Sequence, residues 1–265
     1  MKPMDTRHPV DTRMPAMLRS GQPLRGIFNG LPSPAIVEMC AYAGFDFIVI
    51  DNEHGSADFE TTENMLRAAR ASDIVPVVRC FEFDISRVLD MGASAVQIPM
   101  VNTAQHAARL AQLVRYPAQG RRGSAFSSRA AGYGAFGGDP HTQRSNDGIA
   151  LIVMVETPEG VQNAEAIAAV DGVDAVFVGP NDLSHSMGFG SNWGAPEVQA
   201  AIEQAVRAVV AAGKCAGVLA LTPEDEKKYA AWGARYFASV TTGIFTRALK
   251  QAAQAGRGDD GPVKY

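Results

Sequence analysis

The chain has 265 residues, of which 46% are hydrophobic and 20% charged, and its formal net charge is -4. These values are typical of a globular protein with one large core, and they lack the basic excess that binding to a phosphate backbone requires. Nucleic acid is therefore excluded as a partner. The three cysteines, Cys40, Cys80 and Cys215, are widely spaced, which argues against a disulfide framework and favours a reducing, cytoplasmic location.

The two ends of the chain differ in composition from the part between them. Residues 1–23 mix basic residues with Pro and Asp, and they contain no apolar run long enough for a signal peptide or a membrane span. No membrane partner is predicted, and we interpret this segment as an N-terminal leader that packs on a neighbouring surface. Residues 256–265 form a polar, Gly-rich tail. Residues 24–255 are predicted to form a single catalytic domain.

From residue 24 onward, short apolar runs alternate with longer stretches of helical period. This is the pattern of buried parallel strands, each followed by a covering helix. Eight strands are predicted, at 25–29, 46–51, 75–79, 95–100, 149–156, 175–179, 215–220 and 236–240. Helices are predicted at 33–43, 59–71, 104–115, 196–212 and 223–232. The order favours an α/β fold of the closed (β/α)8 TIM-barrel type. An open doubly wound sheet is the alternative, but its usual GxGxxG signal is absent after the first strand.

One connection is much longer than the others. Residues 116–147 separate a predicted helix from the fifth strand and are rich in Gly, Ser and Arg. Connections of that length are usually functional or disordered. We therefore expect this segment either to serve the site or to lack fixed structure.

Ionisable residues stand at the carboxyl ends of several predicted strands, which is where a barrel of this type carries its chemistry. The second strand runs into Asp-Asn-Glu-His-Gly at 51–55, the third ends at Arg79 and the fifth at Glu156. The sixth runs into Gly-Pro-Asn-Asp at 179–182. All of these residues are predicted to converge on one mouth of the barrel.

Two of them, Glu156 and Asp182, are hard oxygen ligands on neighbouring strand ends. Two protein carboxylates, with the remaining positions left to water and substrate, are a common way to hold Mg2+ or Mn2+. Each carboxylate could instead cap the helix that follows it. Their joint placement favours the metal site.

Arg79 and His54 each admit a functional and a structural interpretation. Arg79 closes an otherwise apolar strand, so its guanidinium leaves the core at the rim, where it can meet an oxyanion or form an ion pair with a rim carboxylate. His54 is the only histidine at a strand end, where a neutral imidazole suits a general base near pH 7. Alone, however, a histidine is more often structural.

Lysine is informative through its absence from most of the chain. None occurs between Lys2 and Lys214, and Lys214 precedes the seventh strand, at the opposite end of the barrel from the mouth. A Schiff base with a substrate carbonyl is therefore excluded. If this barrel breaks a carbon–carbon bond next to a carbonyl, a metal ion must serve as the electron sink.

With these residues in place, the sequence resembles the HpcH/HpaI aldolase family, the metal-dependent pyruvate aldolases with a TIM barrel of the phosphoenolpyruvate/pyruvate-domain type. The similarity extends over residues 25–249. It rests on the order and spacing of five segments, at 46–54, 77–79, 115–123, 155–157 and 172–184.

The resemblance implies a role for each candidate residue. Glu156 and Asp182 would hold a divalent ion such as Mg2+, Mn2+ or Co2+, and Arg79 would stabilise the keto and enolate oxygen of pyruvate. His54 would act as the base, through a water molecule, and Asp90 would orient it.

The resemblance also implies how the substrate is held. Gly179 and Pro180 would line the substrate site, and the backbone N–H groups of Asn181 and Asp182, which open a helix, would receive the pyruvate carboxylate. Homo-oligomers, specifically hexamers that exchange the last helix between subunits, are implied as well. Many relatives have Gly or Ala where this chain has Asn52 and Asn181, and the stretch at 124–133 differs between aldolases of different aldehyde preference. The resemblance therefore leaves the identity of the aldehyde open.

The expected activity is the reversible cleavage of 4-hydroxy-2-oxo acids to pyruvate and an aldehyde. Two alternatives remain at this point. One is an acyl-CoA lyase like the β subunit of citrate lyase, although the Glu53–His54 pair after the second strand fits the aldolases better. The other is a barrel that binds oxo acids without turning them over, which the intact set of site residues argues against.

Overall fold

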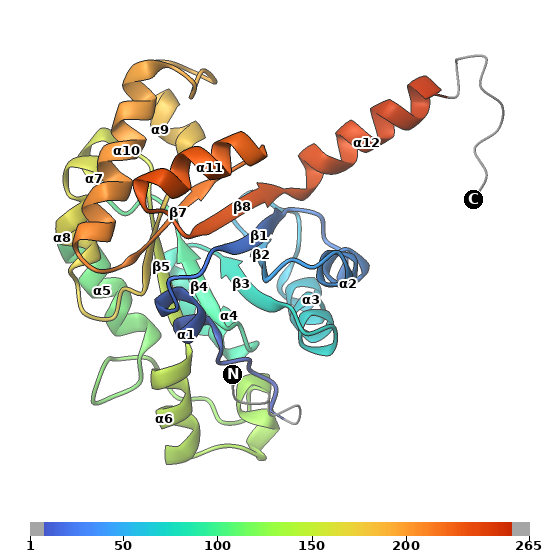
Figure 1. Cartoon of the computed structure of the whole chain (residues 1–265). Helices are drawn as coiled ribbons and strands as arrows, with labels where there is room; N and C mark the ends of the chain where they lie inside the picture. The colour runs from blue at the N-terminus through green and yellow to red at the C-terminus, as the bar shows by residue number, and fades with distance from the viewer. Residues whose placement is uncertain (1–7, 256–265) are drawn as a thin grey trace.

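A computed structural model describes residues 8–255 of the chain, which form a closed barrel of eight parallel strands (Figure 1). The strands are β1 (Leu24–Asn29), β2 (Phe47–Asp51), β3 (Val75–Arg79), β4 (Ala95–Ile98), β5 (Ala150–Val155), β6 (Ala175–Val178), β7 (Cys215–Leu219) and β8 (Tyr236–Val240). Each strand pairs with the next, and β8 pairs with β1. All eight predicted strands are present, and the closure excludes the open doubly wound sheet.

Helices cover the outside of the barrel, as the βα alternation predicts (Figure 1). Several begin at a side chain that accepts a hydrogen bond from the first turn, for example Asp58 before α3 and Thr222 before α11. The helical elements are α1 (Met14–Arg19), α2 (Pro34–Tyr42), α3 (Phe59–Ala71), η1 (Glu82–Asp84), α4 (Ile85–Asp90), α5 (Ala104–Val114), η2 (Arg129–Gly134), α6 (Asp139–Gly148), α7 (Pro158–Gln162), α8 (Ala164–Ala168), α9 (Pro180–Ser186), α10 (Pro196–Ala211), α11 (Pro223–Trp232) and α12 (Thr241–Ala255).

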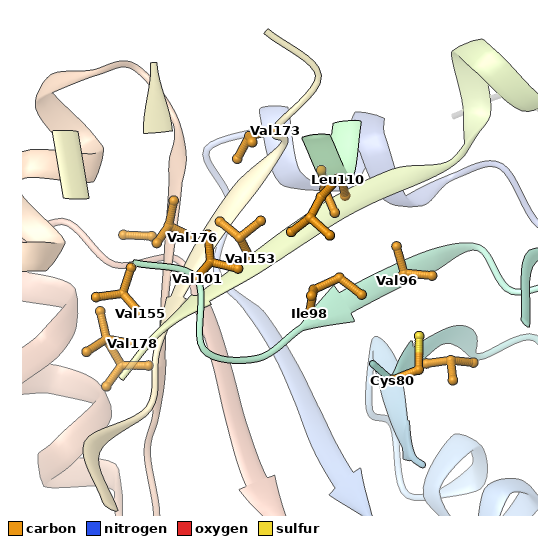
Figure 2. Close-up of a cluster of buried hydrophobic side chains, with 14 of the residues drawn as sticks. Cys80, Val96, Ile98, Val101, Leu110, Val153, Val155, Val173, Val176 and Val178 are labelled. Atoms are coloured by element: carbon orange, nitrogen blue, oxygen red, sulfur yellow. The ribbon is translucent and has the colours of Figure 1, made fainter. Parts of the chain in front are cut away.

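The core has an inner and an outer layer, because successive strand residues point to opposite faces of the sheet. In β2, Ile48 and Ile50 point outward into the layer between strands and helices, where valines of β5 and β6 also lie (Figure 2). Phe47 and Val49 point into the barrel, and the Phe47 ring stacks on Tyr236 at 4.2 Å between centroids. Both layers are apolar, so the strands read as continuous hydrophobic runs.

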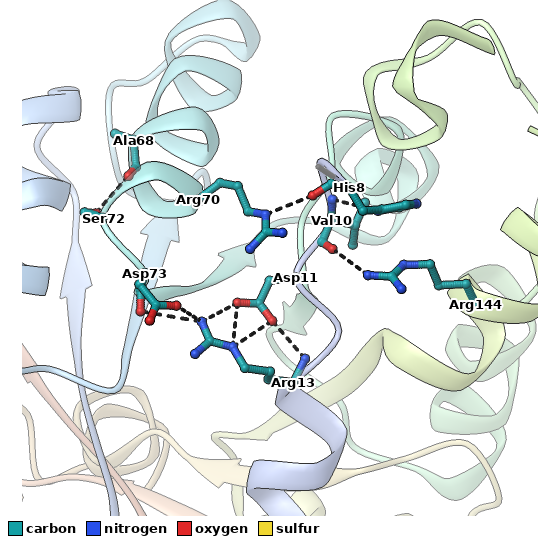
Figure 3. Close-up of polar contacts among 9 residues, drawn as sticks. All are labelled: His8, Val10, Asp11, Arg13, Ala68, Arg70, Ser72, Asp73 and Arg144. Carbon is teal, nitrogen blue, oxygen red and sulfur yellow. Dashed lines mark hydrogen bonds and ion pairs between the residues drawn. The ribbon is translucent and has the colours of Figure 1, made fainter. Parts of the chain in front are cut away.

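The described part of the leader, residues 8–23, packs on the barrel of its own chain. Met14 and Leu18 of α1 are 0% and 5% exposed and belong to the same inner cluster as Leu24 at the start of β1. The helix therefore closes the amino-terminal end of the barrel. Arg13, paired with Asp11 at 2.5 Å and Asp73 at 2.7 Å, fastens this segment to the barrel (Figure 3).

The long connection before β5 is folded, and it contains η2 and α6. Arg122, 2% exposed, organises it: its guanidinium donates to Asp90 at 2.6 Å and Ser145 at 3.1 Å and lies over the Tyr116 ring. The connection follows a covering helix, so within one chain it lies at the end of the barrel opposite the mouth. The expectation of disorder is therefore wrong.

The last described helix leaves the barrel. α12 follows β8 directly and extends away from the other helices (Figure 1), and every residue after Thr241 is partly or fully exposed. Leu249 on this helix is 70% exposed. No helix in residues 8–255 is both long enough and apolar enough to cross a membrane. The predicted tail at 256–265 lies outside the described residues.

Candidate functional site

A cavity of ≈ 390 Å³ opens at the carboxyl ends of the strands. Its inner wall is apolar and comes from strand residues such as Phe28, Met154 and Phe177, while polar side chains form its rim. The lining residues are Phe28, Gly30, Asp51, His54, Arg79, Met154, Glu156, Phe177, Gly179, Pro180, Asn181, Asp182, Leu219, Val240 and Thr242. The structure thus brings together every site residue predicted from the sequence except Asp90.

Arg79 is held by two carboxylates that the sequence places after β2. Its Nε and Nη2 donate to the two carboxylate oxygens of Asp51 at 2.9 Å and 2.6 Å, and its Nη1 lies 3.1 Å from Oε2 of Glu53. The guanidinium also lies over the Phe28 ring, 5.0 Å from its centroid. Asp51 and Arg79 are register partners in the β2–β3 pairing. The ion pair with rim carboxylates is therefore present, and it fixes Arg79 at the cavity wall.

Glu156 is the most deeply buried carboxylate of the cavity, with 2% of its surface exposed. Its Oε2 accepts a hydrogen bond from the Met100 backbone N–H at 2.9 Å. Burial raises the pKa of Glu156 to about 7, and the nearby Asp182 carboxylate acts in the same direction. Gly179 packs directly against it, since a Cβ at that position would lie 2.5 Å from Oε1 of Glu156.

Asp182 and Asn181 lie in the first turn of α9, at the exposed side of the cavity. Neither Glu156 nor Asp182 caps a helix in the way the alternative interpretation required. Thr157 is the residue whose side chain accepts from the helix after β5, and Gly179, without a side-chain cap, precedes α9. The first N–H groups of a helix lack backbone partners within it, so those of Asn181 and Asp182 are available to an anionic ligand.

His54 lies in the loop after β2, and its side chain is 66% exposed. The backbone N–H of His54 donates to Oδ1 of Asp51 at 3.3 Å, which ties the loop to the strand end. The nearest carboxylate to its ring is that of Glu53, with 3.9 Å between Nε2 and Oε2. The imidazole is therefore on the solvent side of the cavity.

Asp90 does not join this group within one chain, contrary to the expectation that it orients His54. It is the last residue of α4, which runs back from the mouth toward the start of β4, so its carboxylate lies at the other end of the barrel. There it accepts a hydrogen bond from Arg122 at 2.6 Å. Within one chain this contact ties α4 to the long connection.

The chain was compared with known protein families and structures. The model of the HpcH/HpaI aldolase/citrate lyase family matches residues 25–247. The chain belongs to this family. It is 40% identical to the hydroxypyruvate/pyruvate aldolase of Delftia acidovorans over 92% of this chain and 90% of the relative. It is 38% identical to the 2-keto-3-deoxy-L-rhamnonate aldolase of Salmonella gallinarum over 88% of each. A crystal structure of an HpcH/HpaI family protein from Burkholderia cenocepacia superimposes with a TM-score of 0.88 at 34% identity, covering 93% of this chain and all of the other.

The cavity of this HpcH/HpaI family member fits a divalent cation by its charge and its donor atoms. When ionised, four carboxylates, of Asp51, Glu53, Glu156 and Asp182, face one guanidinium, of Arg79, and leave three negative charges uncompensated. Within residues 8–255, no three His, Cys, Asp or Glu side chains converge so as to hold an ion by themselves. Glu156 and Asp182 would therefore share the ion with water and substrate, as is usual for Mg2+.

Proposed function

We propose that this family member is a metal-dependent class II aldolase that reversibly cleaves 4-hydroxy-2-oxo acids to pyruvate and an aldehyde. The observation that carries the proposal is the composition of the cavity: carboxylates and one arginine surround an apolar wall, and none of the lining residues is a lysine. A carbanion next to a carbonyl must then be stabilised by a cation rather than by a Schiff base. The aldolase names of the similar proteins support the same reaction.

Glu156 and Asp182 would hold the divalent ion, and Mg2+, Mn2+ and Co2+ all suit their oxygen donors. The bound ion supplies the electrophilic charge that draws electrons toward the 2-oxo group during cleavage. The N–H groups that open α9 receive the substrate carboxylate. These contacts orient the 2-oxo acid in the cavity with its 4-hydroxyl toward the rim.

His54 and Arg79 then carry out different parts of the reaction. His54 takes the proton of the 4-hydroxyl group, directly or through one water molecule, while the bond between carbon 3 and carbon 4 breaks. The electron pair of that bond passes to the pyruvate fragment as its enolate. The N–H groups of Arg79 that Asp51 does not occupy donate to the developing enolate oxygen. Return of a proton to carbon 3 completes the formation of pyruvate.

The oligomer is the second part of the proposal. α12 is an amphipathic helix with Leu249 exposed, and among the described residues it extends away from the other helices (Figure 1). A homo-oligomer in which this helix is exchanged between subunits would cover its apolar side, and a hexamer fits the family resemblance. A cytoplasmic location stays a prediction, based on three cysteines that are all free.

The two alternatives remain distinguishable by substrate. A lyase acting on acyl-CoA thioesters would act without a 4-hydroxy-2-oxo acid, and a non-catalytic barrel would release no pyruvate from any substrate. The aldolase names of relatives that match about nine-tenths of the chain favour the aldol reaction over both.

The deciding experiment is an assay of pyruvate release from 4-hydroxy-2-oxo acids, with and without metal. Because none of the described residues that line the cavity is a lysine, treatment with a chelator should abolish turnover, and added Mn2+ or Mg2+ should restore it. Borohydride in the presence of pyruvate should trap no adduct, as checked by intact-protein mass spectrometry. A covalent pyruvyl adduct on any lysine would disprove the metal mechanism.

A further inference from the structure

The side chain of Glu53 lies close to Arg79 and His54, the two residues that take part in the proposed reaction. Its Oε2 is 3.1 Å from Nη1 of Arg79 and 3.9 Å from Nε2 of His54. The Glu53 side chain is only 11% exposed, and Oε2 has no hydrogen-bond partner among the described residues. Burying a carboxylate oxygen without a hydrogen bond costs free energy unless a nearby cation offsets its charge, and Arg79 is that cation.

Asp51 alone leaves the orientation of Arg79 underdetermined. It engages one edge of the guanidinium, Nε and Nη2, so the plane can still tilt about that edge. Of the five N–H bonds of the group, those on Nη1 and the second on Nη2 remain. The Phe28 ring at 5.0 Å supports one face of the plane. A second anchor at Nη1 is what fixes the direction of the remaining N–H bonds.

We propose that Glu53 is a positioning residue: it holds Nη1 of Arg79, so that the unoccupied N–H bonds of the guanidinium point at the 2-oxo oxygen of the substrate. The inference rests on the proposed function for its substrate class. Its effect is geometric, since hydrogen bonds weaken steeply when donor and acceptor are misaligned. Burial and the neighbouring anions raise the pKa of Glu53, while Arg79 opposes that rise, in keeping with a close contact between the two groups.

The test replaces Glu53 by Gln, which keeps its size and removes its charge. Oxalate, a planar mimic of the pyruvate enolate, is the binding probe, and calorimetry with saturating Mn2+ measures its affinity. We expect Glu53→Gln to weaken oxalate binding about 10- to 100-fold and to slow both aldol cleavage and oxaloacetate decarboxylation by a similar factor. Bound Mn2+ and the melting temperature should stay close to the wild-type values.

A second background shows whether the effect passes through Arg79. In Arg79→Lys, the fork-shaped group is gone, so Glu53 has no plane to orient. Adding Glu53→Gln to Arg79→Lys should therefore weaken oxalate binding by less than about 3-fold, far less than in the wild-type background. Equal factors in the two backgrounds would show that Glu53 acts independently of Arg79 and would overturn the proposal.

Glu82→Gln is the matched control. Glu82 also pairs with an arginine and a histidine, Arg109 at 2.7 Å and His106 at 3.2 Å, but on the outer surface between η1 and α5. It should leave oxalate affinity and both rates unchanged. If Glu53→Gln behaves like Glu82→Gln, Glu53 has only a structural role and the proposal fails.

Two further outcomes are decisive. If Glu53→Gln slows aldol cleavage while decarboxylation and oxalate affinity are retained, Glu53 acts on His54 and the proposal is wrong. If Glu53→Gln does not fold, Glu53→Asp is used. Its side chain is shorter by one methylene group, so its carboxylate no longer reaches Arg79. Unaltered oxalate affinity in that variant also overturns the proposal. A wild-type enzyme that cleaves no oxo acid would refute the proposed function alone, because oxalate binding still tests the positioning.

Discussion

His54 and Arg79 contribute to the proposed reaction at different moments, and their positions allow the two roles to be separated. His54 is on the exposed rim, whereas Arg79 is 10% exposed at the cavity wall and contacts both Asp51 and Glu53. The base is needed only when a hydroxyl proton must be removed. The oxyanion partner is needed whenever the pyruvate enolate forms.

We expect His54→Ala to slow aldol cleavage by about 100- to 10,000-fold, the usual range for loss of a general base. Decarboxylation of oxaloacetate gives the same enolate without that proton transfer, so it should survive much better. Arg79→Ala should damage both reactions. The measurement is the ratio of the two rates at saturating metal for each variant. Parallel losses in His54→Ala would mean that His54 organises the site and is not the base.

The sequence places Asp51 and Glu53 at the mouth of the barrel, but it does not identify them as the partners of Arg79. Both stand in the segment used for the resemblance, but neither was assigned a role, because their function lies in a pairing with Arg79 on another strand. The sequence does contain a signal for this pairing. Asp51 and Arg79 are the last residues of adjacent parallel strands, so their opposite charges lie side by side at the same end of the barrel. Within one chain Asp90 lies at the other end of the barrel from His54, because closeness in sequence to a strand end does not determine at which end of the barrel the following helix finishes.

At the level of elements, the strands were predictable and the first helix was not. Every predicted strand is within two residues of the observed bounds, because each is an apolar run buried on both faces. The six residues of α1 are too few to show a helical period, and their burial depends on a barrel end that the sequence does not reveal. The same holds for α6, whose sequence is polar and whose place is set by the buried Arg122 nearby.

The closing role of α1 leads to a prediction about stability. Met14 is fully buried under the barrel, so Met14→Ala should lower the free energy of unfolding by about 2–5 kcal/mol, the range for buried large-to-small changes. Met39→Ala is the control, because Met39 on α2 is 56% exposed and its loss should change stability by less than about 0.5 kcal/mol. Urea unfolding measures both. Equal effects would show that α1 does not close the barrel in solution.

On the scale of the whole molecule, the buried carboxylate of Glu156 links stability to pH. Its pKa in the folded protein is raised to about 7, above the ordinary value of 4.5. A group raised in this way contributes stability that is complete below the unfolded pKa and is lost as the pH rises through the folded pKa. Without metal, the protein should therefore lose about 1–3 kcal/mol of stability between about pH 5 and pH 8 through this residue.

The measurement is urea unfolding of the chelator-treated protein at both pH values, compared with Glu156→Gln, which cannot ionise and should show a smaller decrease. Added Mn2+ should reverse the trend, because the ion binds the deprotonated carboxylate and is displaced by protons at low pH. Identical pH dependence in the wild type and Glu156→Gln would show that Glu156 is not the group responsible.

Because α1 closes one end of the barrel, the two ends of the domain differ, and this difference can guide where the protein is attached to a support. The described chain enters at the closed end, beside Met14, and the cavity opens at the opposite end. A support attached through a linker near residue 8 would thus hold the catalyst with its opening toward the bulk solution, so reactants would diffuse in unhindered. A linker at the outer end of α12 would instead pull on this helix. The helix is continuous with Val240 and Thr242 of the cavity wall, so the force would reach that wall.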